Sequence, residues 1–127
     1  MLFRSEDGTF QGLCEMMNIP YVGSGVLASA VAMDKSFAKP IFASHGLAVA
    51  SGIVLTQREW STDKSASLAR TQSLGLPLFV KPARSGSSRG TTKVKSSEQL
   101  SDAIESALVH DPKILIEAAV EIGRAHV

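Results

Sequence analysis

Residues 76–95 read LPLFVKPARSGSSRGTTKVK, and this stretch predicts how the second half of the chain folds. Apolar residues dominate 76–82 and alternate with polar residues in 91–95, patterns that are typical of β-strands. The polar, glycine-containing segment 83–90 between them predicts a loop. We therefore expect two strands joined by a loop, with Lys81 at the end of the first strand.

Helical and extended patterns alternate on both sides of this stretch. Asp34 is a good N-cap for a helix, and Pro40 should either kink that helix or shift its start to near Lys39. A Ser-Ser-Glu-Gln capping box and apolar residues four apart predict another helix before the last strand. This order of elements predicts an α/β or α+β fold. The predicted helices span 11–17, 26–33, 34–44, 62–73 and 96–110, and the predicted strands span 48–56, 76–82, 91–95 and 113–120.

The composition of the chain excludes several classes of protein. Its 127 residues are 44% hydrophobic and 20% charged, as in globular proteins and unlike disordered or collagen-like chains. A net charge of +1 provides no electrostatic argument for binding nucleic acid or an anionic membrane. No apolar stretch is long enough to span a bilayer and no secretion signal is visible, so we expect a cytoplasmic protein. The single cysteine, Cys14, cannot form an internal disulfide or, with three scattered His, a zinc site, and is expected in the core.

The loop after the first strand has the composition of a phosphate-binding segment. Gly86 and Gly90 allow backbone conformations that point several N–H groups at one anion. Ser87 and Ser88 add small hydroxyl donors, and Lys81 adds a positive charge. The loop is not a P-loop, because no Gly-Lys-Ser/Thr leads it into a helix. A plain connection between two strands is the alternative interpretation of the same residues.

Five segments, in one order along the chain, match the motifs of a single enzyme family. They are EDGTFQG at 6–12, IPYVGSGVLASAVAMDK at 19–35, GLPLFVKP at 75–82, ARSGSSRGT at 83–91 and HDPKILIE at 110–117. Together they resemble the D-alanine–D-alanine ligases, members of the ATP-grasp superfamily. The resemblance implies the α+β ATP-grasp type of fold.

The resemblance also implies a site for ATP. Lys35 would contact the nucleotide phosphates from a helix, and Lys81 would contact them from the strand end. Glu117 would meet the adenine amino group, and the backbone near Val120 would hydrogen-bond to adenine. Taken without the resemblance, Lys35 is an ordinary solvated charge and Glu117 an edge-strand residue facing water.

For the loop, the resemblance implies a mobile lid over the transferred phosphate. Gly86, Ser88 and Gly90 would bind the nucleotide, and Ser87 would also link to the substrate side as a catalytic residue. Arg89 departs from the family, which usually has a small or aliphatic residue at this position.

The implied activity is ATP-dependent formation of the D-alanyl-D-alanine dipeptide of peptidoglycan through an acyl phosphate. D-alanine and ATP would be the substrates, Mg²⁺ a cofactor whose ligands lie outside this chain, and the parent protein a homodimer. A D-alanine–D-lactate ligase, or another ATP-grasp ligase, is the alternative within this class. A non-catalytic nucleotide-binding module is the alternative from another class.

The resemblance divides the chain into parts. Residues 6–38 would end an N-terminal substrate domain, and 39–120 would form the first lobe of the ATP-grasp domain. The tails 1–5 and 121–127 match translated sequencing adapter. The adapter sequence CTCTTCCGATCT encodes Leu-Phe-Arg-Ser, and the opposite strand, read as GAGATCGGAAGAGCACACGTC, encodes Glu-Ile-Gly-Arg-Ala-His-Val. We therefore expect an interior fragment of a ligase, inactive by itself because it lacks the metal ligands and the catalytic Arg.

Overall fold

The computed structural model describes residues 5–122. The chain divides into two compact units, 1–48 and 49–127, and each is described by itself. Parts of both predicted adapter tails, 1–4 and 123–127, lie outside the described residues. No helix within 5–122 is long and apolar enough to cross a membrane.

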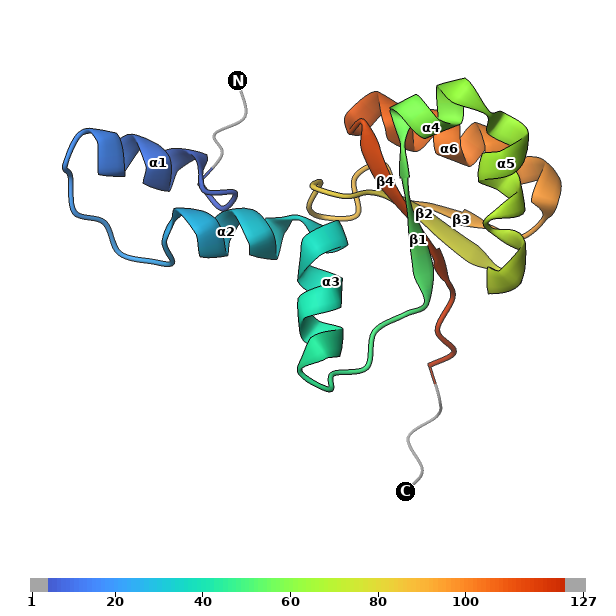
Figure 1. Cartoon of the computed structure of the whole chain (residues 1–127), viewed down its shortest axis with the longest axis horizontal. Coiled ribbons are helices and arrows are strands. Elements are labelled where there is room, and N and C mark those ends of the chain that lie inside the picture. Colours follow the sequence, from blue (N-terminus) through green and yellow to red (C-terminus); the bar gives the residue numbers. More distant parts are fainter. Residues whose placement is uncertain (1–4, 123–127) are drawn as a thin grey trace. The chain divides into compact units, whose positions relative to one another are not determined.

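Within its described residues 5–48, the first unit contains three helices, α1 (Thr9–Met16), α2 (Val26–Met33) and α3 (Lys35–Ser44) (Figure 1). Asp34 caps α3 as predicted, because its Oδ1 accepts hydrogen bonds from the Ser36 N–H at 2.9 Å and the Ser36 hydroxyl at 2.6 Å. The alternative start near Lys39 is therefore wrong, and Pro40 lies inside the helix. Cys14 is buried, as expected.

The second unit is built on a four-stranded sheet of β1 (Gly52–Thr56), β2 (Leu78–Pro82), β3 (Thr92–Val94) and β4 (Lys113–Ala118). The strand order is β1-β4-β2-β3, and every neighbouring pair is antiparallel. The last strand in the sequence, β4, is therefore an inner strand between β1 and β2 (Figure 1). This mixture of helices with a sheet agrees with the predicted fold class.

One face of the sheet is covered by helices. Helix α6 (Leu100–His110) packs against β2, β3 and β4. The other helical segments of this unit are α4 (Gln57–Thr62), α5 (Lys64–Ala69), η1 (Gln72–Leu74) and η2 (Ser97–Gln99). The core between the helices and the sheet is fully buried at Leu55, Val80, Ile104 and Ile116, and Trp60 packs into it. Because side chains alternate along a strand, the residues between these positions face the opposite side.

The predicted helix 62–73 is wrong, because two caps divide this region differently. Thr56 and Glu59 form a capping box that starts α4 at Gln57. Asp63 then accepts a hydrogen bond from the Ala66 N–H at 2.9 Å and starts α5. The Thr-x-x-Glu spacing in the sequence was the local signal for this earlier start.

Other predicted boundaries also move. The first strand begins at Gly52 rather than at 48, and β2 begins at Leu78, after a cis Leu76–Pro77 peptide bond. The predicted capping box at the start of helix 96–110 is wrong, because Ser96 makes no side-chain cap. Instead, the Gln99 side chain accepts a hydrogen bond from the Lys95 N–H at 3.0 Å, and a 3-10 turn precedes α6.

Candidate functional site

Lys81 and Glu117 form an ion pair on the face of the sheet opposite the helices. The Lys81 Nζ lies 2.5 Å from the Glu117 Oε2, with the Lys81 side chain 26% exposed and the Glu117 side chain 6% exposed. Two of the predicted nucleotide-binding residues of the second unit are thus brought together. The interpretation of Glu117 as an edge residue facing water is wrong, because β4 pairs with strands on both sides.

The register of the sheet explains why these two residues meet. Lys81 pairs with Leu115 and Phe79 pairs with Glu117, so Lys81 and Glu117 are diagonal neighbours on one face. The next strand adds Lys93, whose Nζ lies 5.7 Å from the centre of the Phe79 ring. This face, which we call the open face because it is opposite α6, therefore carries two ammonium groups, a carboxylate and an aromatic ring within three adjacent strands, with Glu117 itself buried.

Three residues of the loop after β2 have a left-handed backbone conformation. Ser87 has φ 52°, Ser88 has φ 56° and Gly90 has φ 75°. Two turn hydrogen bonds hold it, from the Arg89 N–H to the Gly86 carbonyl and from the Thr91 N–H to the Ser88 carbonyl, both at 3.1 Å. The loop extends beyond the end of β2 (Figure 1). The serines, rather than the glycines alone, therefore adopt the turn conformation that exposes backbone N–H groups.

The start of this loop is held by a buried carboxylate that sequence reasoning missed. Asp111, only 3% exposed, accepts hydrogen bonds from the Arg84 backbone N–H and from two nitrogens of the Arg84 guanidinium, at 2.9–3.1 Å. Burial by itself would raise the pKa of Asp111, but the bonds from Arg84 and from the Lys113 N–H outweigh it and lower that pKa. In the sequence, Asp111-Pro112 indicated only the end of a helix, and no local signal paired it with Arg84.

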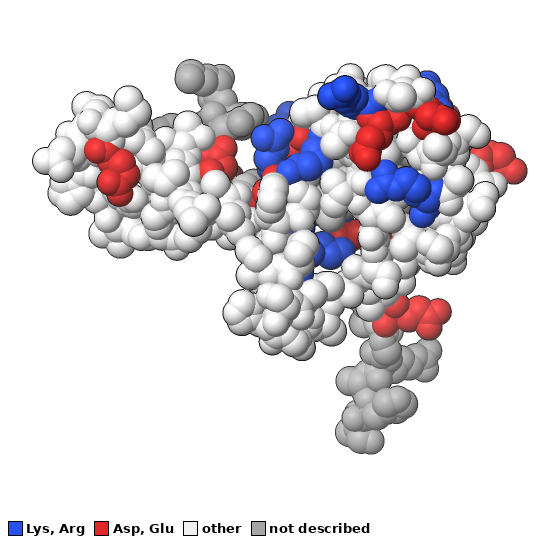
Figure 2. All heavy atoms as spheres, viewed as in Figure 1, with Lys and Arg blue, Asp and Glu red and all other residues white. Residues whose placement is uncertain are grey.

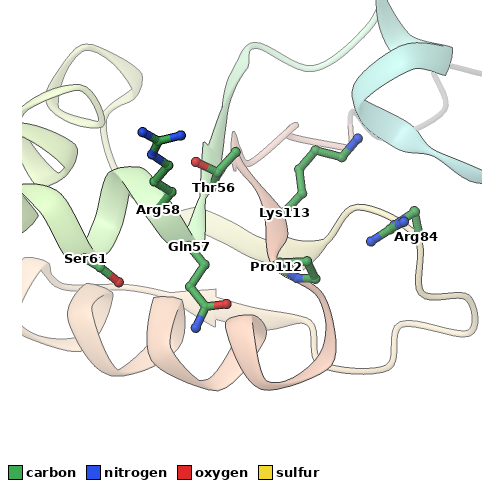
Figure 3. Close-up of a pocket in the computed structure, with 7 residues that line it drawn as sticks. All are labelled: Thr56, Gln57, Arg58, Ser61, Arg84, Pro112 and Lys113. Atoms are coloured by element: carbon green, nitrogen blue, oxygen red, sulfur yellow. The ribbon is translucent and has the colours of Figure 1, made fainter.

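An open depression of about 620 Å³ lies where β1 ends and β4 begins (Figure 3). Three basic side chains, Arg58, Arg84 and Lys113, line it together with Thr56, Gln57, Ser61 and Pro112. None of the predicted site residues is among these. Across the view in Figure 2, acidic and basic side chains are interspersed over this unit, in keeping with the near-neutral net charge.

The other predicted residues lie in separate places. Lys35 is the first residue of α3, in the first unit. Val120 follows β4 and is exposed. Among residues 5–122, no three His, Cys, Asp or Glu side chains gather in a way that could hold a metal ion. The described residues therefore do not fit a Mg²⁺ site, and no chemical step through a metal is assigned to them.

Comparison with known proteins defines the class to which this fold and site belong. A family model described as the D-ala D-ala ligase C-terminus matches residues 41–127. The chain belongs to this family. The resemblance predicted from the sequence motifs is thereby confirmed.

Individual relatives narrow the comparison. The chain is 56% identical, over 94% of its length, to a D-alanine–D-alanine ligase of Paenarthrobacter aurescens, and 53% identical, over 91%, to one of Streptomyces coelicolor. It spans about 31% of the length of these relatives.

Solved structures support the same assignment. A VanG D-Ala:D-Ser ligase from Enterococcus faecalis superposes with a TM-score of 0.82 at 37% identity, over 91% of this chain and 33% of that one. A Bacillus anthracis D-alanine–D-alanine ligase complexed with ATP superposes with a TM-score of 0.77 at 33% identity, over 92% of this chain and 37% of that one. The predicted ATP-grasp ligase fold is confirmed by these neighbours.

Proposed function

We propose that this chain is part of an ATP-dependent D-alanine–D-alanine ligase and supplies one side of its nucleotide site. The observation that supports this most is the Lys81–Glu117 pair on the open face of the sheet, in a chain 56% identical to such a ligase. The enzyme would act in the cytoplasm, as a homodimer, in making peptidoglycan precursors.

The reaction would proceed in two steps. A carboxylate oxygen of the first D-alanine attacks the terminal phosphorus of ATP, and the bond to ADP breaks. The amine of a second D-alanine then attacks the acyl carbon, inorganic phosphate leaves and the amine loses a proton. Catalysis of such transfers consists mainly of holding the groups in line and neutralising their charge.

The second unit would contribute to both ends of ATP. Lys81 would bind a phosphate oxygen as a point charge. A carboxylate has about four lone-pair positions, so Glu117 can accept a hydrogen bond from the adenine amino group while it still contacts Lys81. The backbone near Val120 would add a hydrogen bond to adenine, and Lys35 would reach the phosphates from the first unit.

The loop would act as a lid on the phosphates. Gly86, Ser88 and Gly90 would present backbone N–H groups, and Ser87 would link to the substrate. The left-handed serines support this role, because their conformation is one that forms anion-binding concavities.

We also propose that these 127 residues do not catalyse ligation by themselves. Mg²⁺ bridges phosphate oxygens in related phosphoryl transfers, whereas the described residues offer no carboxylate cluster for it. The chain would instead bind nucleotide without turnover.

Titration calorimetry of the 127-residue chain with ATP tests the nucleotide site. Lys81→Gln should weaken ATP binding about tenfold or more, because a charge-assisted bond contributes roughly 1.5–3 kcal/mol. Lys95→Gln removes an exposed lysine just after β3 and serves as the matched control. Equal affinities for Lys81→Gln and the wild type would contradict the role of Lys81. Formation of the D-alanyl-D-alanine dipeptide by the 127-residue chain, incubated with ATP and D-alanine, would contradict its inactivity.

For the second substrate, D-serine is an alternative to D-alanine that one specific observation supports. The solved neighbour with a TM-score of 0.82 is a D-Ala:D-Ser ligase. We favour D-alanine because relatives named D-alanine–D-alanine ligase reach 56% identity, compared with 37% for that neighbour. Incubating the full-length protein with ATP, D-alanine and either D-serine or D-lactate, and identifying the products by mass, distinguishes these ligases.

A further inference from the structure

The corner between α6 and β4 holds the start of the loop. Four hydrogen bonds converge on the two Asp111 oxygens: three come from Arg84 and one, at 3.0 Å, comes from the Lys113 N–H. The neighbouring Ala83 N–H donates to the Lys113 carbonyl at 3.0 Å. Because one carboxylate binds both the main chain and the side chain of Arg84, it determines the position and the direction of the chain as it leaves β2.

The same corner also limits the end of the loop. A Cβ added to Gly90 would lie 2.6 Å from the His110 Cδ2 and 2.9 Å from the Pro82 Cγ. Gly90 therefore packs directly against the residue that precedes Asp111 in the sequence. Residues 84–90 thus begin and end on one corner, and the segment between these ends contains the two turn hydrogen bonds that Gly86 and Ser88 accept.

We propose that Asp111 is a positioning residue for the phosphate-binding loop. It acts through Arg84: the backbone N–H and the guanidinium of Arg84 both bind Asp111, and this holds the start of the loop next to the sheet. This inference rests on the proposed function, because it concerns how the loop is presented to the nucleotide. Ser87 and Ser88 are then held within reach of the phosphates without contacting Asp111.

The geometry explains why an ionised carboxylate is required. One oxygen accepts from the Arg84 backbone N–H and Nε, and the other accepts from Nη2 and from the Lys113 N–H. An amide at this position has one oxygen and one NH₂ group, so half of these donors would face another donor. Asp111→Asn should therefore release the loop even though it preserves the size of the side chain.

Limited trypsin digestion of the 127-residue chain measures the position of the loop. Trypsin can cut after Arg89 inside the loop, and after Arg58 in α4 as an internal reference. A variant that merely loosens the whole fold raises both rates together, while local release raises the Arg89 rate selectively. The measured quantity is therefore the ratio of the two rates, together with the dissociation constant for ATP.

For Asp111→Asn we expect the ratio to rise about fivefold or more and ATP to bind several-fold more weakly. Arg84→Gln should act in the same direction and provides a second test if the Asp111 variant does not fold. Glu105→Gln is the matched control, because Glu105 also accepts from a basic side chain, Lys64, and from Trp60, but lies away from the loop. It should leave the rate of cleavage after Arg89 and the ATP affinity unchanged; because its partner Trp60 lies in α4, the Arg58 rate is not used as the reference for this variant.

Two outcomes would overturn the inference. One is an unchanged ratio in Asp111→Asn and Arg84→Gln, which would leave Asp111 as a structural residue only. The other is a raised ratio with unchanged ATP affinity, which would separate loop position from nucleotide binding. If the wild-type chain binds no ATP, the proposed function fails, and with it the link to the nucleotide; the ratio then still decides whether Asp111 positions the loop.

Discussion

The two faces of the sheet in the second unit use neighbouring residues of the same strands for different purposes. On the helix-covered face, Val80 and Ile116 are fully buried in an apolar core. On the open face, the adjacent residues Lys81 and Glu117 form an ion pair. Apolar burial stabilises the fold, whereas a paired charge contributes little net stability and retains its capacity to bind a ligand. We therefore expect stability and nucleotide binding to separate by face.

Truncation on the core face should have the largest effect. Ile116→Ala removes three carbons from a fully buried side chain, and the cavity that remains should cost about 2–5 kcal/mol of unfolding free energy. Urea unfolding followed by the fluorescence of Trp60, the single tryptophan, measures this loss. A loss below about 1 kcal/mol would mean that the helices do not define the core face.

The neighbouring substitution on the open face should change ligand recognition instead. Glu117→Gln should reduce the preference for ATP over inosine triphosphate, which lacks the purine amino group, by about tenfold, or roughly 1.4 kcal/mol. Paired titrations of the wild type and the variant with both nucleotides measure this preference. Lys95→Gln should leave it unchanged. A preference for ATP that persists in Glu117→Gln would remove Glu117 from the adenine contact.

Acid should weaken the fold by protonating Asp111, which lies at the corner between α6 and β4. Although burial acts in the other direction, the hydrogen bonds from Arg84 and Lys113 hold the folded-state pKa of Asp111 below its ordinary value of 3.8. A carboxyl with a lowered folded-state pKa stabilises the protein above its ordinary pKa, and this stabilisation is lost as the pH falls through the folded value. We expect the urea concentration at the unfolding midpoint to decrease as the pH is lowered below about 4. The decrease should be smaller in Asp111→Asn.

Two other carboxyls have to be separated from this effect. The pKa of Glu59 is lowered by hydrogen bonds from the Thr56 backbone and side chain, and that of Glu105 by hydrogen bonds from Lys64 and Trp60. Both are intact in Asp111→Asn, so the difference between the wild type and this variant isolates Asp111. Identical acid sensitivity of the two proteins would contradict the assignment.

A surface contact on the open face should have the smallest effect. Lys93→Gln removes the ammonium group 5.7 Å from the centre of the Phe79 ring and should cost about 0.5–1 kcal/mol, as for other exposed cation–π contacts. The same urea experiment measures it. A loss as large as that of Ile116→Ala would erase the proposed difference between the two faces.

Local signals in the sequence predicted much of the fold and part of the site. The range of α2, Val26–Met33, and the capping role of Asp34 were both correct, since each depends on residues close in sequence. Helix 62–73 was wrong because Thr56 and Asp63 placed helix starts that the apolar pattern did not reveal. The motif resemblance identified the family, and the roles that it implies for individual residues stay predictions.

The sequence by itself determined the family and the class of fold, and it predicted which residues would contact a nucleotide. Only the tertiary structure decided that β4 inserts between β1 and β2, which places Glu117 beside Lys81 and Asp111 beneath Arg84. The partners in these pairs are separated in sequence by the loop, β3 and α6. Helix caps and turns arise from neighbours along the chain, but strand order and register arise from packing and backbone hydrogen bonds across the whole sheet.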